Sequence, residues 1–230
     1  EAYRVLADPT RRRAYDEELS LDDQQTIDWS WPVEAEQNFD TGELLAAEGR
    51  HEEAVAAFGE ARAKDDQAEY RTMEAWSIFR ANGETPEAAR AVISMVYQEM
   101  ERTPGQYMIH VIAARLHRAA EQPDLAVQQY QEALALNPEL PAVFDELEAL
   151  LSGEGQEEQL EEQYRRVLLQ LGHRNPEWAA ELWKRLTALY HKKLQDQQQA
   201  RTALQVVRAV SPKEDALELE LKLELFPEDE

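Results

Sequence analysis

A recurring pattern of small and large apolar positions runs through most of the chain. A small residue is followed, four and seven positions later, by two residues of core type, and the pattern returns about every 34 residues. Its clearest examples are Ala54, Phe58 and Ala61, then Ala126, Tyr130 and Ala133, then Ala200, Leu204 and Val207. Positions spaced in this way lie on one face of an α-helix, so each triplet predicts the buried stripe of one helix.

Two further segments carry the pattern in altered form. We align Ala88, Val92 and Met95 in one of them, and Leu160, Tyr164 and Val167 in the other, where leucine replaces the small residue. Glycines and Asn-Pro or Ser-Pro pairs separate the segments, as expected where helices end. We therefore predict five helix pairs, over residues 35–68, 69–106, 107–140, 141–175 and 176–212.

The spacing has a simple physical basis. A small residue lets two antiparallel helices approach closely, but a single pair cannot bury its own apolar face. Stacked pairs bury a continuous core, and at least about three are needed. The pattern resembles the tetratricopeptide (TPR) repeat, and this resemblance implies an all-α, right-handed solenoid of about five pairs. An irregular helical bundle is the alternative.

Charge and composition narrow the function. The formal net charge of −23 disfavours binding to nucleic acid or to an anionic membrane surface. No apolar run approaches the roughly 20 residues of a membrane span. The chain has no cysteine, which is compatible with the reducing cytoplasm, where we expect the protein. We expect neither nucleic acid nor a membrane as a partner.

The first 19 residues carry a second pattern. Tyr3 and Leu6 lie on one helical face, and Asp8 with Pro9 ends that helix and caps the next. Together with Tyr15, these residues resemble the C-terminal part of a DnaJ-type J-domain, the module that stimulates Hsp70. The His-Pro-Asp loop of that family is absent, so residues 1–19 alone should not stimulate Hsp70. Because the chain starts at Glu1 rather than Met, we expect a longer parent protein, whose upstream residues could supply that loop.

The segments that flank the repeats are less regular. Residues 20–34 are acidic and contain Ile27, Trp29 and Trp31, which predicts an extended linker whose aromatic residues dock on the first repeat or bind a partner. Over residues 213–230, leucines alternate with charged residues from Leu217 to Leu225, which alone is typical of a strand. A solenoid offers a strand no sheet partner, so we favour a closing helix or the start of a further repeat.

We find no catalytic or metal-binding constellation. His110 and His117 lie seven residues apart, but both align with core positions and no carboxylate lies between them at ligand spacing. The paired glutamates lack any feature that would raise one pKa, and no glycine-rich phosphate loop is present. We predict no enzymatic activity, no cofactor and no metal.

The TPR resemblance also implies a binding surface, because in that family the first helix of each pair lines a concave groove. The implied groove residues are Phe39, Tyr70, Met73, Ser77, Arg80, Met108, Val111, Arg115 and Arg118. In the fourth and fifth units the matching positions hold Asp145 and Ala149, then Arg185, Leu189, Lys192 and Lys193. Arginines beside apolar residues in so acidic a chain predict a groove for an acidic, apolar segment of a partner protein. Alternatively, the arginines pair with neighbouring glutamates and only keep the surface soluble.

Some TPR domains hold the C-terminal carboxylate of Hsp70 or Hsp90 through a defined set of Lys, Asn and Arg residues. The matching positions here hold Phe39, Glu43, Glu74, Met108 and Ile112, and none agrees. We therefore predict an adaptor that binds a partner protein. An Hsp70 co-chaperone with its J-domain completed upstream is the first alternative, and a self-associating structural protein, favoured by the apolar last helix, is the second.

Overall fold

The computed structural model describes residues 30–210 together with Leu219 and Leu223. The J-domain-like residues 1–19, and Ile27 and Trp29 of the linker, lie outside this described part. Within it, ten α-helices and no β-strand are present. None of these helices is long and apolar enough to cross a membrane.

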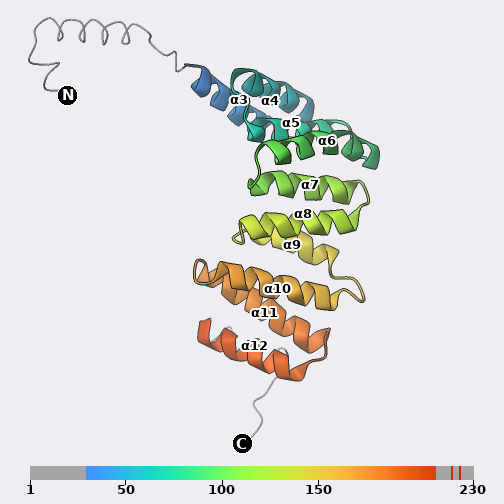
Figure 1. The fold of residues 1–230 in the computed structure, drawn as a ribbon, viewed down its shortest axis with the longest axis vertical. Helices are drawn as coiled ribbons and strands as arrows, with labels where there is room; N and C mark the ends of the chain where they lie inside the picture. Colours follow the sequence, from blue (N-terminus) through green and yellow to red (C-terminus); the bar gives the residue numbers. More distant parts are fainter. Residues whose placement is uncertain (1–29, 211–218, 220–222, 224–230) are drawn as a thin grey trace, which may run out of the picture.

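The helices form five successive pairs. They are α3 (Ser30–Ala47) with α4 (His51–Lys64), α5 (Ala68–Ala81) with α6 (Pro86–Arg102), α7 (Tyr107–Ala119) with α8 (Pro123–Leu136), α9 (Pro141–Leu150) with α10 (Glu157–Leu171), and α11 (Pro176–Lys192) with α12 (Gln197–Val210). Figure 1 shows the pairs stacked in chain order into one elongated array. The predicted all-α solenoid of helix pairs is confirmed.

The residues that punctuate the sequence set the helix boundaries. Proline occupies the first turn of α6, α8, α9 and α11, where its missing N–H costs no intrahelical hydrogen bond. The side chains of Thr85 and Asn175 cap α6 and α11 by accepting hydrogen bonds from the amides of Ala88 and Trp178, each at 3.1 Å. Gly49 ends the α3–α4 turn with a φ of 78°, a conformation that glycine adopts without strain.

Helix α3 begins earlier than the sequence indicates. It starts at Ser30, so residues 30–34 are helical. The extended linker predicted over residues 20–34 is therefore wrong for residues 30–34. Pro32 lies within the first turn, where proline is compatible with a helix. Trp31 is on this helix with 43% of its surface exposed, and its side chain is therefore not docked in the core.

The second pair follows a register one residue later than the one predicted. Ala89 and Val96 are completely buried, whereas Ala88 and Met95 are only half-buried. Ala89 is the fourth residue of α6, as Ala54 is of α4 and Ala126 of α8. The alignment on Ala88 is therefore wrong, because one additional residue separates the first and second units.

The fourth pair is packed differently from the others. The paired helices lie close together in the other four units, but α9 and α10 do not. At the crossing, where the first pair has Gly42 and Ala54, the fourth has Glu148 and Leu160. Side chains of this size hold the two helix backbones apart. The rings of Phe144 and Tyr164 fill part of the space, with centroids 4.8 Å apart and planes at 61°.

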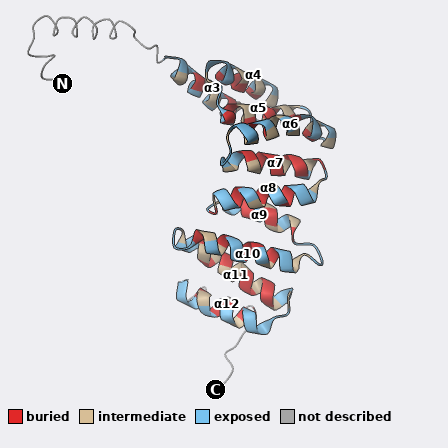
Figure 2. Ribbon diagram, in the orientation of Figure 1, coloured by how far each residue is buried: buried red, intermediate tan, exposed pale blue. Residues whose placement is uncertain are grey.

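The core runs the length of the array. In Figure 2 the buried residues lie on helix faces turned toward neighbouring helices, from α3 to α12. One large cluster joins the third, fourth and fifth pairs and includes Leu223, which is 3% exposed. Leu219 packs against the same cluster, and the backbone is helical at both leucines.

Candidate partner-binding surface

A carboxylate on α9 ties the third pair to the fourth. Glu146 accepts hydrogen bonds from Arg115 Nε at 3.0 Å and Nη2 at 2.6 Å, and from the hydroxyl of Tyr130 at 2.5 Å. Arg118 Nη1 lies 3.1 Å from the same carboxylate. Three helices therefore meet at one side chain, whose exposed fraction is only 21%.

This environment shifts the pKa values of Glu146 and Tyr130. Burial opposes ionisation of Glu146, but hydrogen bonds from Arg115 and Tyr130 outweigh it and lower the pKa of Glu146 below its ordinary value. The pKa of Tyr130 is raised, first by burial and then by its hydrogen bond to the carboxylate. Near neutral pH the cluster therefore contains an ionised Glu146 and a neutral tyrosine.

Toward the C-terminal end of the array, α9 is tied to the fifth pair. Arg185 of α11 lies 2.5 Å from Asp145 and 3.0 Å from Glu148, and it also pairs with Glu181 on its own helix at 3.0 Å. The hydroxyl of Tyr164 donates to Glu148. The carboxylates of α9 thus lie between arginines from α7 and α11, so Arg115, Arg118 and Arg185 also join successive repeats.

An open hollow of about 500 Å³ lies between the first helices of the second, third and fourth pairs; we call it the α5–α7–α9 hollow. Its lining consists of Trp76, Phe79, Arg80, Glu84, Arg115, Arg118, Ala119 and Glu146. Three arginines against two glutamates give this lining a charge of +1, in a chain whose net charge is −23. Arg80 pairs with Glu84 at 3.1 Å and lies 5.9 Å from the centre of the Trp76 ring, a cation–π distance.

The structure brings together three of the nine groove residues implied by the sequence. Arg80, Arg115 and Arg118 all line the α5–α7–α9 hollow. Their pairing with Glu84 and Glu146 is the arrangement that the alternative interpretation predicts. The side chains of Arg80 and Arg118 nevertheless remain 36% and 48% exposed.

The other six groove residues lie elsewhere. Tyr70, Ser77 and Val111 are buried, with exposed fractions of 6%, 0% and 2%, so they cannot present a surface to a partner. For Tyr70 and Ser77 the cause is the one-residue register shift, which places Ser77 at a helix crossing. Phe39 stacks on Tyr70, with ring centres 4.8 Å apart. Met73 is half-buried, and Met108 is 36% exposed but does not line the hollow.

Sequence reasoning missed Trp76, Phe79 and Glu146 as parts of this surface. Trp76 and Phe79 match the repeat pattern and therefore read as core residues, yet both reach the hollow. Glu146 lies next to Asp145, which was placed on the inner face. One signal in the sequence would have identified Glu146. The first helix of the fourth pair carries several acidic residues, and the first helix of the third pair carries arginines that can pair with them.

His110 and His117 both make hydrogen-bond contacts within the protein. His117 is buried, with Nε2 2.9 Å from the hydroxyl of Tyr97 and Nδ1 2.8 Å from Gln122. His110 Nδ1 lies 2.9 Å from the side-chain oxygen of Gln129. Among the residues that the structure describes, no group of three or more His, Cys, Asp or Glu side chains could hold a metal ion.

Comparison with known proteins identifies the fold. No family model and no curated relative matches the sequence. A chain of the Naa15/Naa10 complex bound to HypK-THB matches 82% of this chain with a TM-score of 0.60 and 18% identity, and the match covers only 28% of that chain. Yeast Tom70 matches 94% of this chain with a TM-score of 0.55 and 14% identity, over 43% of its own length.

A third solved structure is of similar length. The putative kinesin light chain of Podosopora anserina, with nearly identical TPR-like repeats, matches 80% of this chain and 97% of its own, with a TM-score of 0.53 and 20% identity. Likeness at these identities shows the fold alone. Together with the five helix pairs, it establishes that the chain is a TPR-like α-solenoid.

Proposed function

We propose that the chain is an interaction scaffold whose α5–α7–α9 hollow binds an acidic, apolar segment of a partner protein. The observation that carries the proposal is the clustering of Arg80, Arg115 and Arg118 beside Trp76 and Phe79 on a strongly acidic chain. Arginine matches a carboxylate with two parallel N–H donors, and the half-buried Trp76 ring supplies apolar contact. Phe79 is buried and packs against that ring, with ring centres 5.2 Å apart.

The arginines retain capacity for a second acceptor. A guanidinium carries five N–H donors, and Arg118 uses only Nη1 in its ion pair with Glu146. Arg80 directs Nε toward Glu84 and toward His51 Nε2 at 3.4 Å. Both side chains are more than one third exposed, so an incoming carboxylate can reach the remaining donors without breaking the cluster at Glu146.

A solenoid of this fold can hold another protein. The Naa15/Naa10 structure has HypK-THB bound, although this chain corresponds to little more than a quarter of the chain it matches. That example supports partner binding as a class of function, while the chemistry of the partner is inferred from the arginines and aromatic residues of the hollow.

The test neutralises the two most exposed arginines and leaves the Arg115–Glu146 pair intact. We expect Arg80→Gln with Arg118→Gln to weaken binding of a fluorescein-labelled peptide that alternates leucine and glutamate by about tenfold, as measured by fluorescence anisotropy. Arg165→Gln with Arg166→Gln on α10 is the matched control, because it removes the same charge from residues outside the hollow. Equal affinity for both double variants, at unchanged melting temperature, would contradict the proposal.

The resemblance of residues 1–19 to a J-domain favours a second candidate, an Hsp70 co-chaperone whose repeats hold the client. These residues lie outside the described part of the structure, so the support is the sequence alone. The test is an Hsp70 ATPase assay on the protein with any residues that precede Glu1 included. Stimulation that depends on an upstream His-Pro-Asp loop would support this role, and unchanged ATPase activity would exclude it.

A further inference from the structure

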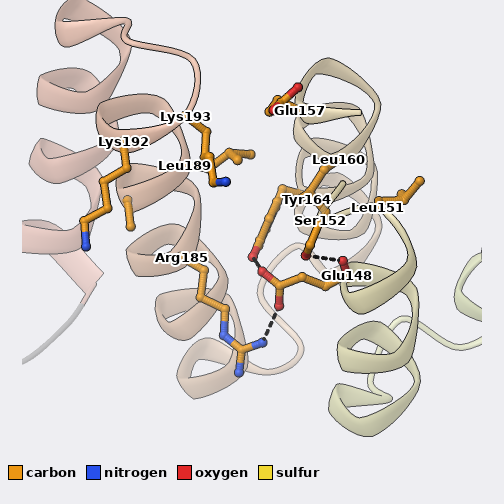
Figure 3. Close-up of a pocket in the computed structure, with 11 residues that line it drawn as sticks. Glu148, Leu151, Ser152, Glu157, Leu160, Tyr164, Arg185, Leu189, Lys192 and Lys193 are labelled. Atoms are coloured by element: carbon orange, nitrogen blue, oxygen red, sulfur yellow. Dashed lines mark hydrogen bonds and ion pairs between the residues drawn. The ribbon is translucent and has the colours of Figure 1, made fainter. Parts of the chain in front are cut away.

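A second hollow, of about 330 Å³, opens between α9, α10 and α11; we call it the α9–α11 hollow (Figure 3). Leu151, Leu160, Ala188 and Leu189 give it an apolar lining. Its volume lies at the small end of ligand sites, which span about 300–1,000 Å³. Such a space fits one large side chain and a short stretch of backbone rather than a folded element.

The altered fourth pair accounts for this hollow. Glu148 and Leu160 both line it, and they occupy the crossing positions that hold small residues in the first, third and fifth pairs. Because they hold α9 and α10 apart, the space that those pairs close by backbone contact remains open here. Tyr164 and Arg185 both bind Glu148, and Figure 3 shows the three side chains converging at one end of the hollow.

The charge at the mouth of the hollow is unbalanced. Arg185 is engaged by three carboxylates, but Lys192 and Lys193 make no ion pair with any residue of the described chain. By contrast, Lys64 and Lys184 pair with Glu34 and Glu181. In Figure 3, Lys193 extends from α11 toward α10. Two adjacent lysines without an ion-pair partner among the described residues therefore lie beside an apolar space, in a chain of charge −23.

We infer that the α9–α11 hollow is a separate subsite that takes one large aliphatic or aromatic side chain of the partner segment, with an adjacent carboxylate held by Lys193 and with Lys192 adding positive charge nearby. This inference rests on the proposed function and adds a site outside the α5–α7–α9 hollow. Apolar burial supplies the affinity, and the lysines select segments in which acidic residues flank the anchor.

The probe is an acetylated, amidated peptide with one leucine flanked by two glutamates on each side, in a glycine–serine background. At about 1 mM peptide, the weak end of specific binding, we expect shifts of the methyl resonances of Leu160 and Leu189 in the NMR spectrum of the full chain. A peptide with lysine in place of glutamate, and one with serine in place of leucine, should produce no shift.

Variants assign the interaction to the hollow. Lys192→Glu with Lys193→Glu should weaken binding by about tenfold, while Arg165→Glu with Arg166→Glu, which changes the net charge equally on α10, should not. Ser152→Trp at the exposed rim should block the hollow without removing any core side chain. If the lysine variant binds as tightly as the control, or if the Leu160 and Leu189 methyls do not respond, the inference is wrong.

The methyl group of Ala119, in the α5–α7–α9 hollow, separates the two proposals. A shift at Ala119 without one at Leu160 would leave the proposed function standing and overturn the second subsite. If the peptide shifted no methyl resonance in either hollow, both the proposed function and the second subsite would be overturned. If the Leu160 and Leu189 resonances instead shift with protein concentration, and Ser152→Trp abolishes the change, the occupant is a second copy of the chain and the inferred partner is wrong.

Discussion

A Cβ atom at position 42 would lie 2.6 Å from the ring of Phe58, which is completely buried. Real Cβ atoms essentially never come so close to a neighbour. Gly42→Ala therefore forces the Phe58 ring or helix α4 to move, although alanine is the better helix former. We expect the variant to be less stable by about 1–3 kcal/mol, as measured by urea unfolding.

Gly59 provides the matched control for this substitution. It lies within α4, and a Cβ there would meet only the Oε1 atom of Glu74, at 3.5 Å, an ordinary contact. We expect Gly59→Ala to gain about 0.5–1 kcal/mol from the lower entropy of the unfolded chain. If the two variants were equally stable, close packing at Gly42 would not limit the approach of α3 and α4.

The register of the second pair can be tested in the same way. Ala89 is completely buried at the helix crossing, whereas Ala88 is half-buried beside it. We expect Ala89→Leu to cost about 1–3 kcal/mol by overpacking, and Ala88→Leu to cost less than about 1 kcal/mol. Thermal unfolding of the two variants measures the difference. The reverse order would favour the alignment predicted from the sequence.

The sequence predicted the fold because its signal repeats. In the first, third and fifth units, a small residue and two partners recur in constant register, and the structure buries all nine residues. The second unit lacked this redundancy, since Ala88 and Ala89 are both alanine and the period alone could not choose between them. Packing against neighbouring helices determines which of the two alanines lies at the helix crossing, and that information is not contained in the local sequence.

The candidate site was less predictable than the fold. Groove positions came from the family pattern, so the one-residue slip carried Tyr70 and Ser77 into the predicted surface, although both are buried. Arg115 and Arg118 line the α5–α7–α9 hollow. Their pairing with Glu146 depends on how closely α7 and α9 approach, and the separation of α9 from α10 depends on side chains at two distant positions. Neither relationship follows from helical periodicity.

Glu146 should make the joint between the third and fourth pairs sensitive to acid. The pKa of Glu146 is lowered in the folded state. Its contribution to stability is therefore fully present at a pH above the ordinary pKa of glutamate, and it is lost as the pH falls through the lower pKa of the folded state. At neutral pH we expect Glu146→Gln to cost about 1–3 kcal/mol, because the partly buried Arg115 loses its carboxylate. The difference from wild type should shrink as pH falls from about 6 to about 3.

Glu162 is the control for that pH series. Its side chain is 63% exposed and pairs with Arg166 on the same helix, so Glu162→Gln should leave the stability nearly unchanged. Urea unfolding at each pH gives the comparison. If the cost of Glu146→Gln were constant from neutral to acidic pH, the carboxylate would not be the stabilising group.

Glu99 should show the opposite dependence. It is 4% exposed, and burial raises its pKa, while Arg71 at 3.3 Å lowers it and Asp66 raises it further. As pH rises above the ordinary pKa of glutamate, the Glu99 carboxyl loses its proton in the unfolded chain before it does so in the folded protein. The folded state therefore loses stability until the pH passes the raised pKa of Glu99. Glu99→Gln stays neutral and escapes this loss, and Arg71 keeps its ion pair with Asp66 at 2.9 Å. Its stability relative to wild type should therefore improve as pH rises through this window. Parallel curves for wild type and Glu99→Gln would show that folding does not shift the pKa of Glu99.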